Sequence, residues 1–354
     1  MHILITGGAG FVGSNLAIAL KKKYPAYTIT CLDNLKRRGS EFNLSHLREN
    51  DISFIHGDIR NYEDLESIPE FDCMIEASAE PSVLAGITSP IEQVLDNNLI
   101  GAMNCLRLAK KFNAFFIFLS SSRVYPIKHL NNIAYSEQPT RFALNEKQDL
   151  PGISIQGVSE NFPLSGSRSF YGFTKLAAEL LIQEYHDLVG LPMVINRCGV
   201  IAGPGQMGKV DQGFITLWVA RHYWKEQLAY IGFGGMGKQV RDILHIEDLF
   251  SLIDYQIHHV DKVNGDTLNI GGGLNTSLSL SEATKLCEEV TGNKIQISTE
   301  KETRPADVRI YYTDSSYAKN KINWYPKKLS REIIQDVFEW IHQNESSLKN
   351  ILRS

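Results

Sequence analysis

A glycine-rich turn near the amino terminus constrains this chain more than any other feature. The apolar run at residues 3–5 leads into Gly7-Gly8-Ala9-Gly10-Phe11-Val12-Gly13, and a helical pattern follows to about residue 22. Glycines lack a Cβ, so the backbone can turn sharply from strand to helix and leave its amides open to an anion. The spacing is G-x-x-G-x-x-G rather than G-x-G-x-x-G, and the same glycines would suit a tight turn without a ligand.

The first half of the chain alternates short apolar runs with helical patterns. Apolar runs begin near residues 27, 52, 72, 114 and 192, and helical patterns occupy about 94–111 and 171–189. This alternation predicts a parallel sheet with helices on both faces and ligands at the carboxyl ends of its strands. After residue 200 the glycines cluster and the alternation becomes irregular. We therefore predict an α/β protein with a Rossmann-type, doubly wound parallel sheet in an NAD-binding domain at 1–200. Residues 201–354 are expected to form a smaller C-terminal α/β substrate-binding lobe, with some segments returning to the first domain.

Two helices are expected in the second half. Ser279-Leu280-Ser281-Glu282 has the pattern of a capping box that opens a helix reaching about residue 291. Residues 330–342 place apolar side chains at helical spacing on one face.

Composition excludes several classes of protein. Lys and Arg number 36 and Asp and Glu 40, so a net charge of −4 gives no reason to expect nucleic acid or an anionic membrane as partner. The five cysteines are widely spaced without a C-x-x-C pair, which argues against a disulfide framework and against a metal site of the usual zinc spacing. The longest apolar run, 114–119, is far too short to cross a bilayer, and the start lacks the basic residues of a signal peptide. The expected location is cytoplasmic.

Asp33 supports the dinucleotide interpretation of the glycine turn. It ends the second apolar run, about 20 residues after Gly13, where a carboxylate accepts both ribose hydroxyls and repels a 2′-phosphate. This favours NAD over NADP, although Arg37 and Arg38 follow closely and weaken the choice. Asp58, after the third apolar run, is placed equally well to meet the adenine or to cap its own loop.

Tyr171 and Lys175 give the most specific chemical signal. Four residues apart on a helix, they share one face. A free tyrosine has a pKa of about 10 and is a poor base, and a neighbouring ammonium favours the phenolate form. Ser121 lies in the cluster Ser120-Ser121-Ser122 at the end of an apolar strand, where it can orient a substrate hydroxyl. Y-x-x-x-K alone is common by chance, so the prediction of a catalytic site depends on all three side chains.

These residues resemble those of extended short-chain dehydrogenase/reductases, in the NAD-dependent sugar-nucleotide epimerase/dehydratase family. The resemblance covers nearly the whole chain, including the segment Gly237-Lys238-Gln239-Val240-Arg241-Asp242. It implies an enzyme that uses NAD on a nucleotide-diphosphate sugar, often as a homodimer or homotetramer. The implied catalytic residues are Ser121, Tyr171 and Lys175, with the adjacent Ser122 as the alternative to Ser121. The implied cofactor contacts are Gly7, Gly10, Phe11, Val12, Gly13, Asp33, Asn34, Asp58, Ile59, Ala77, Ala79, Asn98, Tyr171, Lys175 and Val200. The implied substrate contacts are Ser82, Ser122, Arg123, Cys198, Gln212, Gly213, Arg241 and Arg304.

Departures from the family pattern narrow the reaction. Dehydratases of the family carry Asp-Glu directly after the catalytic hydroxyl residue, where this chain has Ser122 and Arg123, so a 4,6-dehydratase is disfavoured. The segments Asp33-Asn34-Leu35, Asp211-Gln212-Gly213 and 137–142 are similar to those of the CDP-tyvelose (CDP-paratose) 2-epimerase group. The resemblance thus implies epimerisation at C2 of a CDP-sugar through a keto-sugar. A UDP-sugar 4-epimerase, an NAD(P)-dependent reductase or dehydratase and, more remotely, a non-catalytic NAD-binding protein remain alternatives.

Overall fold

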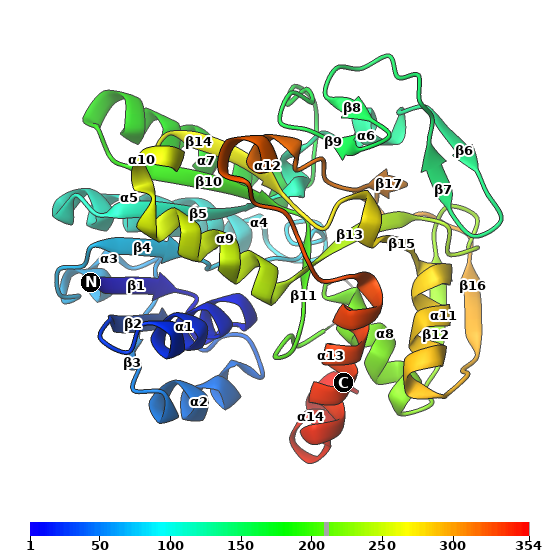
Figure 1. Ribbon diagram of the computed structural model, residues 1–354, viewed down its shortest axis with the longest axis horizontal. Helices are drawn as coiled ribbons and strands as arrows, with labels where there is room; N and C mark the ends of the chain where they lie inside the picture. The colour runs from blue at the N-terminus through cyan, green and yellow to red at the C-terminus, as the bar shows by residue number, and fades with distance from the viewer. Residues whose placement is uncertain (209–211, 354) are drawn as a thin grey trace. The chain divides into compact units, whose positions relative to one another are not determined.

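The computed structural model describes residues 1–208 and 212–353 (Figure 1). The chain divides into two compact units. The domain boundary expected near residue 200 lies close to Arg197, where the chain passes from unit 1 to unit 2. The 125–169 segment joins unit 2, which is therefore no smaller than unit 1, and 250–268 returns to unit 1. Unit 1 comprises Met1–Val124, Phe170–Arg197 and Phe250–Leu268, and unit 2 comprises Tyr125–Ser169, Cys198–Leu249 and Asn269–Ser354.

A seven-stranded sheet, built largely from unit 1, confirms the predicted Rossmann-type fold (Figure 1). Its order is β14-β10-β5-β4-β1-β2-β3, so the chain runs outward from β1 to β3 and then returns to β4 on the other side of β1. The carboxyl ends of β1 and β4 flank this reversal, and Thr6 on β1 lies opposite Glu76 on β4 in parallel register. Ligands of doubly wound sheets bind at such a reversal because the loops diverge there. The strands are β1 His2–Thr6, β2 Thr28–Asp33, β3 Ser53–His56, β4 Cys73–Glu76, β5 Phe115–Ser121, β10 Met193–Cys198 and β14 Asp266–Ile270.

Helices pack against the sheet. On one face, Leu4 and Phe116 of the sheet lie in the same buried cluster as Leu106 and Ile182 from two helices. Side chains alternate across a strand, so Ile3 faces the other way. There the first helix packs on β1 and β2. The helices are α1 Phe11–Lys23, α2 Asn43–Glu49, α3 Tyr62–Glu66, α4 Ile91–Leu95, α5 Gly101–Phe112, α7 Phe170–Val189 and α10 Val260–Val263, with α9 Ile246–His258 running from unit 2 into unit 1.

The helix expected at about 94–111 is interrupted. A π-helical turn, η2 (Asp96–Ile100), separates α4 from α5. Asn98 is buried within this turn, and its amide bonds to two other segments of the chain. An extra residue in a helical turn redirects a side chain, which explains why the apolar periodicity missed the break.

Unit 2 is a second α/β assembly. Strand β13 pairs with β11 and β17 in parallel and with β15 in antiparallel direction. Three helices, α8, α11 and α13, pack together through buried residues that include Trp218, Cys287 and Ile334. The predicted capping box is confirmed, because Ser279 and Glu282 cap each other's backbone at the start of α11. The principal elements are β11 Val200–Ala202, α8 Phe214–Tyr223, β13 Val240–His245, β15 Ser277–Ser279, α11 Leu280–Thr291, β17 Ile310–Tyr311 and α13 Ser330–Gln343.

Smaller elements complete unit 2. They are α6 Ile127–Asn131, β6 Tyr135–Glu137, β7 Phe142–Leu144, β8 Ile153–Ser154, β9 Gly157–Val158, β12 Leu228–Ile231, β16 Ile297–Glu300, α12 Ser316–Ile322 and α14 Glu345–Leu352. Within residues 1–208 and 212–353, no helix is both long and apolar enough to cross a membrane.

Candidate active site

The glycine turn between β1 and α1 fits a bound diphosphate. Gly7 has a φ of +65°, and a Cβ there would lie 2.8 Å from the carbonyl oxygen of Ala77. A Cβ on Gly13 would lie 2.3 Å from the carbonyl oxygen of Gly7. The N-cap of α1, Gly10, provides no side-chain cap, and the first turn holds no acidic residue. The turn therefore needs glycine for its own packing, and it presents backbone amides at the positive end of a helix, where an anion is favoured.

Asp33 supports the same turn from the end of β2. One carboxylate oxygen accepts a hydrogen bond from the amide of Ala9 at 3.1 Å, and the other accepts one from Leu35 at 2.8 Å. Burial raises the pKa of the Asp33 carboxyl, and these backbone donors oppose that effect. Each carboxylate oxygen has a second lone pair, so both can still accept a ribose hydroxyl.

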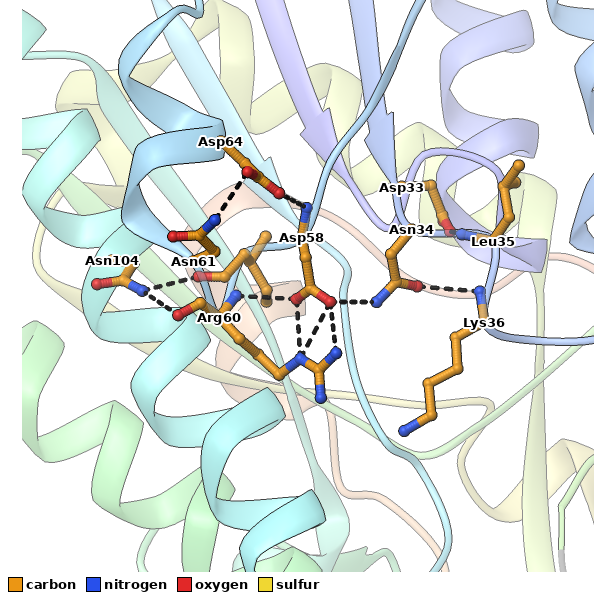
Figure 2. A network of polar contacts seen from close by, with 10 residues as sticks. Asp33, Asn34, Leu35, Lys36, Asp58, Arg60, Asn61, Asp64 and Asn104 are labelled. Atoms are coloured by element: carbon orange, nitrogen blue, oxygen red, sulfur yellow. Dashed lines mark hydrogen bonds and ion pairs between the residues drawn. The ribbon is translucent and has the colours of Figure 1, made fainter.

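A pocket of ≈ 390 Å³ opens beyond the ends of β2 and β3. Figure 2 shows that Asp58 lies at the centre of its polar network. Arg60 donates from Nε to Asp58 Oδ1 at 2.9 Å and from its terminal nitrogen to Oδ2 at 2.6 Å, and Asn34 donates to Oδ2 at 2.9 Å. These donors, Arg60 above all, lower the pKa of Asp58 to about 2. The pocket is lined by Asn34, Lys36, His56, Gly57, Asp58, Arg60 and Asp64.

Neighbouring residues engage both the carboxylate and the backbone amide of Asp58. The Arg60 ion pair occupies much of the carboxylate, and Asp64 accepts from the Asp58 amide at 2.8 Å. Ile59 is buried with its side chain against Gly101, so it can offer a ligand little more than its backbone.

Asn98 ties the loop after β4 to α7. Its side-chain oxygen accepts from the amide of Glu80 at 2.7 Å, and its amide nitrogen donates to the Glu80 carbonyl at 3.1 Å and to Thr174 Oγ1 at 3.2 Å. The loop it holds carries three predicted contacts, Ala77, Ala79 and Ser82, all half-buried. Asn98 thus fixes this loop beside the helix that bears Tyr171 and Lys175.

Tyr171 lies in the first turn of α7 and is 8% exposed. Its ring belongs to a small apolar cluster with Ala85 and Val94. The carbonyl of Tyr171 accepts from the Thr174 hydroxyl at 2.8 Å, which stiffens this turn. The Tyr171 side chain is therefore largely shielded from water.

Lys175, one turn further along α7, has a partner that the sequence did not predict. Its ammonium lies 3.6 Å from Oε2 of Glu76, and both side chains are almost fully buried. The same ammonium lies 4.4 Å from the ring centre of Phe118 on β5. The only sequence signal for Glu76 was a carboxylate at the end of the apolar run 73–75, in the position that Asp33 occupies on β2.

Ser121 ends β5, and α7 packs against β5 and the following turn, η3 (Ser122–Val124). Its hydroxyl oxygen accepts from the amide of Arg123 at 3.1 Å. The preceding Ser120 donates to Glu179, which Arg197 binds from Nε at 3.0 Å and from a terminal nitrogen at 2.8 Å. This buried network, also missed in the sequence, holds the end of β5 against α7.

The predicted contacts fall in both units. In unit 2, Arg241 is ion-paired with Asp307 at 2.8 Å, Gly213 is the left-handed N-cap of α8, and Cys198 is buried. Asp211 lies outside the described residues. Unit 1 contains Gly7, Gly10, Phe11, Val12, Gly13, Asp33, Asn34, Asp58, Ile59, Ala77, Ala79, Ser82, Asn98, Ser121, Ser122, Arg123, Tyr171 and Lys175, and unit 2 contains Cys198, Val200, Gln212, Gly213, Arg241 and Arg304.

Comparisons with known proteins identify the family of the chain. The model of the NAD dependent epimerase/dehydratase family matches residues 3–271. A CDP-paratose 2-epimerase from Salmonella typhi is 32% identical over 349 residues, 96% of this chain and 99% of that protein. A UDP-glucuronate 4-epimerase from Thermodesulfobacterium geofontis is 27% identical over 359 residues, 99% of each. The structure of a dTDP-glucose 4,6-dehydratase from Bacillus anthracis in complex with NAD is 27% identical and matches 99% of each chain with a TM-score of 0.77.

The family resemblance noted in the sequence is confirmed. Because dependence on NAD defines the matched family, the expectations of an enzyme and of NAD as its cofactor are confirmed too. The family model matches most of the chain and a relative is 32% identical over 96% of it, so this chain belongs to the NAD dependent epimerase/dehydratase family.

Proposed function

We propose that the protein epimerises a nucleotide-diphosphate sugar through a keto-sugar intermediate, at C2 of a CDP-sugar of the paratose/tyvelose type. The observation that carries the reaction type is the placement of Tyr171 and Lys175 one turn apart on α7, with Ser121 on the strand end that packs against this helix. The support for C2 and for CDP is the 32% identity to a CDP-paratose 2-epimerase across almost the full length of both proteins.

The chain's own groups account for the proton chemistry. Tyr171, as phenolate, takes the proton of the sugar hydroxyl, and Ser121 donates a hydrogen bond that orients that oxygen. NAD, when bound, supplies a nicotinamide that accepts the carbon-bound hydrogen with its two electrons and later returns it. Lys175, one turn along α7 from Tyr171, is assigned the positive charge that favours this phenolate. Inversion requires the keto-sugar to turn so that the hydrogen returns to the opposite face of its planar carbonyl carbon, while Tyr171 gives its proton back to the carbonyl oxygen.

Most of the proposed cofactor contacts lie in unit 1. The α1 amides at Phe11, Val12 and Gly13 hold the diphosphate, and Asp33 accepts the ribose hydroxyls. The pocket at Asn34 and Asp58 takes the adenosine end.

The proposed substrate contacts lie in both units. In unit 1, Ser82, Ser122 and Arg123 are assigned to the sugar. In unit 2, Arg241 and Arg304 are assigned to the diphosphate, because a guanidinium bonds phosphate oxygens with a planar pair of donors. The Asp307 partner of Arg241 fixes the orientation of that fork. Cys198, Gln212 and Gly213 are the remaining proposed substrate contacts, and Val200 is a proposed cofactor contact.

A UDP-sugar 4-epimerase is the second candidate. A UDP-glucuronate 4-epimerase matches 99% of this chain at 27% identity, and inversion at C4 needs the same three catalytic side chains. The two candidates differ in which sugar carbon is presented to Tyr171, and so they predict different products.

A substrate panel tests the proposal. The purified protein is incubated separately with CDP-paratose, CDP-glucose and UDP-glucose, and products are followed by NMR in heavy water. We expect the C2 epimer of CDP-paratose without solvent deuterium on carbon, because the same hydrogen returns. Deuterium on carbon would indicate an enolate route and contradict the mechanism. Tyr171→Phe should lower turnover at least about a hundredfold, and near-normal turnover would reject Tyr171 as the base.

Assembly into a homo-oligomer is part of the proposal. Helix α7 exposes Phe173, Leu180 and Leu188, with 47%, 55% and 76% of their surfaces exposed. An apolar helix face of this kind suits a second copy of the chain. Light scattering after size exclusion should give a dimer or tetramer mass, and Leu180→Asp should shift it toward the monomer; a monomeric wild type would refute this part.

A cytoplasmic location completes the proposal. All five cysteines are buried free thiols, which suits a reducing compartment. Fractionation of cells that produce the protein would test it, and recovery from an extracytoplasmic fraction would contradict it.

A further inference from the structure

Glu76 occupies a position that the proposed mechanism does not explain. It ends β4 at the reversal of strand order, is 1% exposed, and lies opposite Thr6 on β1 and Phe118 on β5. Its Oε1 accepts from the Ser78 amide at 3.0 Å. Among the described residues Oε2 has no hydrogen-bond partner, and it lies 3.6 Å from Lys175 Nζ. A carboxylate in such a place is costly unless it balances another buried charge.

The buried charge near Glu76 is the ammonium of Lys175. The lysine is 2% exposed, and its ammonium is enclosed between Glu76 and the face of the Phe118 ring. An ammonium taken out of water loses several kcal/mol of hydration, and an aromatic face returns only part of it. Without a nearby anion, a buried lysine loses its proton more easily or turns away toward solvent.

We propose that Glu76 is a positioning residue that keeps Lys175 protonated and directed toward the carboxyl ends of β4 and β5. Glu76 touches neither the reacting hydroxyl nor Tyr171 in this account, and it acts through the lysine. The catalytic part of this inference rests on the proposed function, because Lys175 matters to turnover only if Tyr171 is the base.

The other titratable groups near this pair do not replace Glu76. On α5, burial raises the pKa of the Cys105 thiol well above its usual range, so Cys105 stays neutral. On α7, Tyr171 and Glu179 lie one turn before and after Lys175, and Glu179 is engaged by Arg197. Burial also raises the pKa of Glu76, and the Lys175 ammonium opposes this by favouring its ionised form.

The test measures Lys175 directly in the protein without added substrate. Lysine labelled with ¹³C at the ε-carbon is followed by NMR across pH, and Lys175→Arg identifies the resonance. In Glu76→Gln, Lys175 should lose its proton at a pH at least about one unit lower than in the wild type. Glu76→Asp keeps the charge with a shorter reach, so it should recover about half of the shift but not all of it. Glu179→Gln is the matched control, because it also removes a buried carboxylate and lies on α7 with Lys175. It should leave the Lys175 titration within about 0.3 pH unit of the wild type.

A second measurement ties the charge to catalysis, on whichever sugar the substrate panel identifies. Glu76→Gln should lower kcat at least about tenfold while KM stays within about threefold, and the limb of kcat/KM that rises with pH should move to higher pH. Glu179→Gln should lower stability without moving that limb.

The outcomes separate this inference from the proposed function. An unchanged Lys175 titration in Glu76→Gln, or equal effects of Asp and Gln at position 76, would overturn it. Where Glu76→Gln does not fold, Glu76→Asp decides, because its longer separation should still lower the titration of Lys175, and a wild-type curve would overturn the inference. A shifted titration in a protein that epimerises no sugar supports the positioning role and refutes only the proposed function.

Discussion

Asp58 and Glu76 are acidic residues at the carboxyl end of the same sheet, and each is paired with a cation, yet their surroundings move their pKa values in opposite directions. The Asp58 side chain is 20% exposed, and Arg60 lowers its pKa to about 2. Glu76 is 1% exposed, and burial raises its pKa although Lys175 lies 3.6 Å away. Pairing dominates where water still solvates the charges, and desolvation dominates where it does not.

The two carboxylates therefore affect stability in opposite ways as pH changes. The ionised form of Asp58 is favoured in the folded state, so its contribution is present above its unfolded pKa of 3.8 and is lost as pH falls through about 2. The ionised form of Glu76 is disfavoured, so the folded state loses stability as pH rises above the unfolded value of 4.5 and through the raised folded pKa.

The largest effect is expected from breaking the buried pair. Lys175→Met should lower turnover at least about a hundredfold, and it should lower the free energy of unfolding by about 3 kcal/mol because Glu76 loses its partner. Adding Glu76→Gln should restore part of the stability and none of the turnover. Urea unfolding and steady-state kinetics measure both; strictly additive stability losses would show that the two side chains are not coupled.

The buried ion pair between Arg197 and Glu179 tests whether breaking any buried pair lowers turnover. Arg197→Met leaves Glu179 without its cation and should lower the free energy of unfolding by about 3 kcal/mol. Turnover should fall less than about tenfold, because neither residue is one of the proposed catalytic side chains. A loss of turnover as large as in Lys175→Met would contradict the distinction between the two pairs.

At the pocket, a smaller effect is expected. Asp58→Asn should lower the free energy of unfolding by less than about 1 kcal/mol near pH 7, because the ion pair is partly solvated. The difference from the wild type should shrink as pH falls from about 5 toward about 2, where Asp58 becomes protonated in both folded and unfolded chains. Urea titrations at several pH values measure this, and a difference that does not change with pH would contradict the lowered pKa of Asp58.

The smallest effect on stability is expected from removing the exposed cation. Arg60→Ala should change the free energy of unfolding by less than about 0.5 kcal/mol. The pKa of Asp58 should nevertheless rise by at least about one unit, because Arg60 is the main cause of its depression. Carboxyl ¹³C NMR, with Asp58→Asn for assignment, follows this titration. If the pKa of Asp58 stays near 2 in Arg60→Ala, then Asn34 and the backbone donors, rather than Arg60, are the cause of its lowering.

Much of unit 1 could be predicted because its signals are local. The apolar runs, the glycine turn and the Tyr171–Lys175 spacing each depend on a few neighbouring residues, and strands and helices formed where these patterns occur. The π-turn at Asn98 was missed because one extra residue in a turn barely alters apolar periodicity. Unit 2 was harder to delimit, because 125–169 joins it across a long separation in sequence.

The sequence by itself determined the sheet, the glycine turn and the helical spacing of Tyr171 and Lys175, because steric limits on the backbone and helical periodicity act over a few residues. Only the tertiary structure decided which charges meet. Glu76 reaches Lys175, and Glu179 reaches Arg197, because packing brings separate strands and helices together and leaves no water between them. Burial then fixes how strongly each charge depends on its partner, and no local pattern in the chain records that dependence.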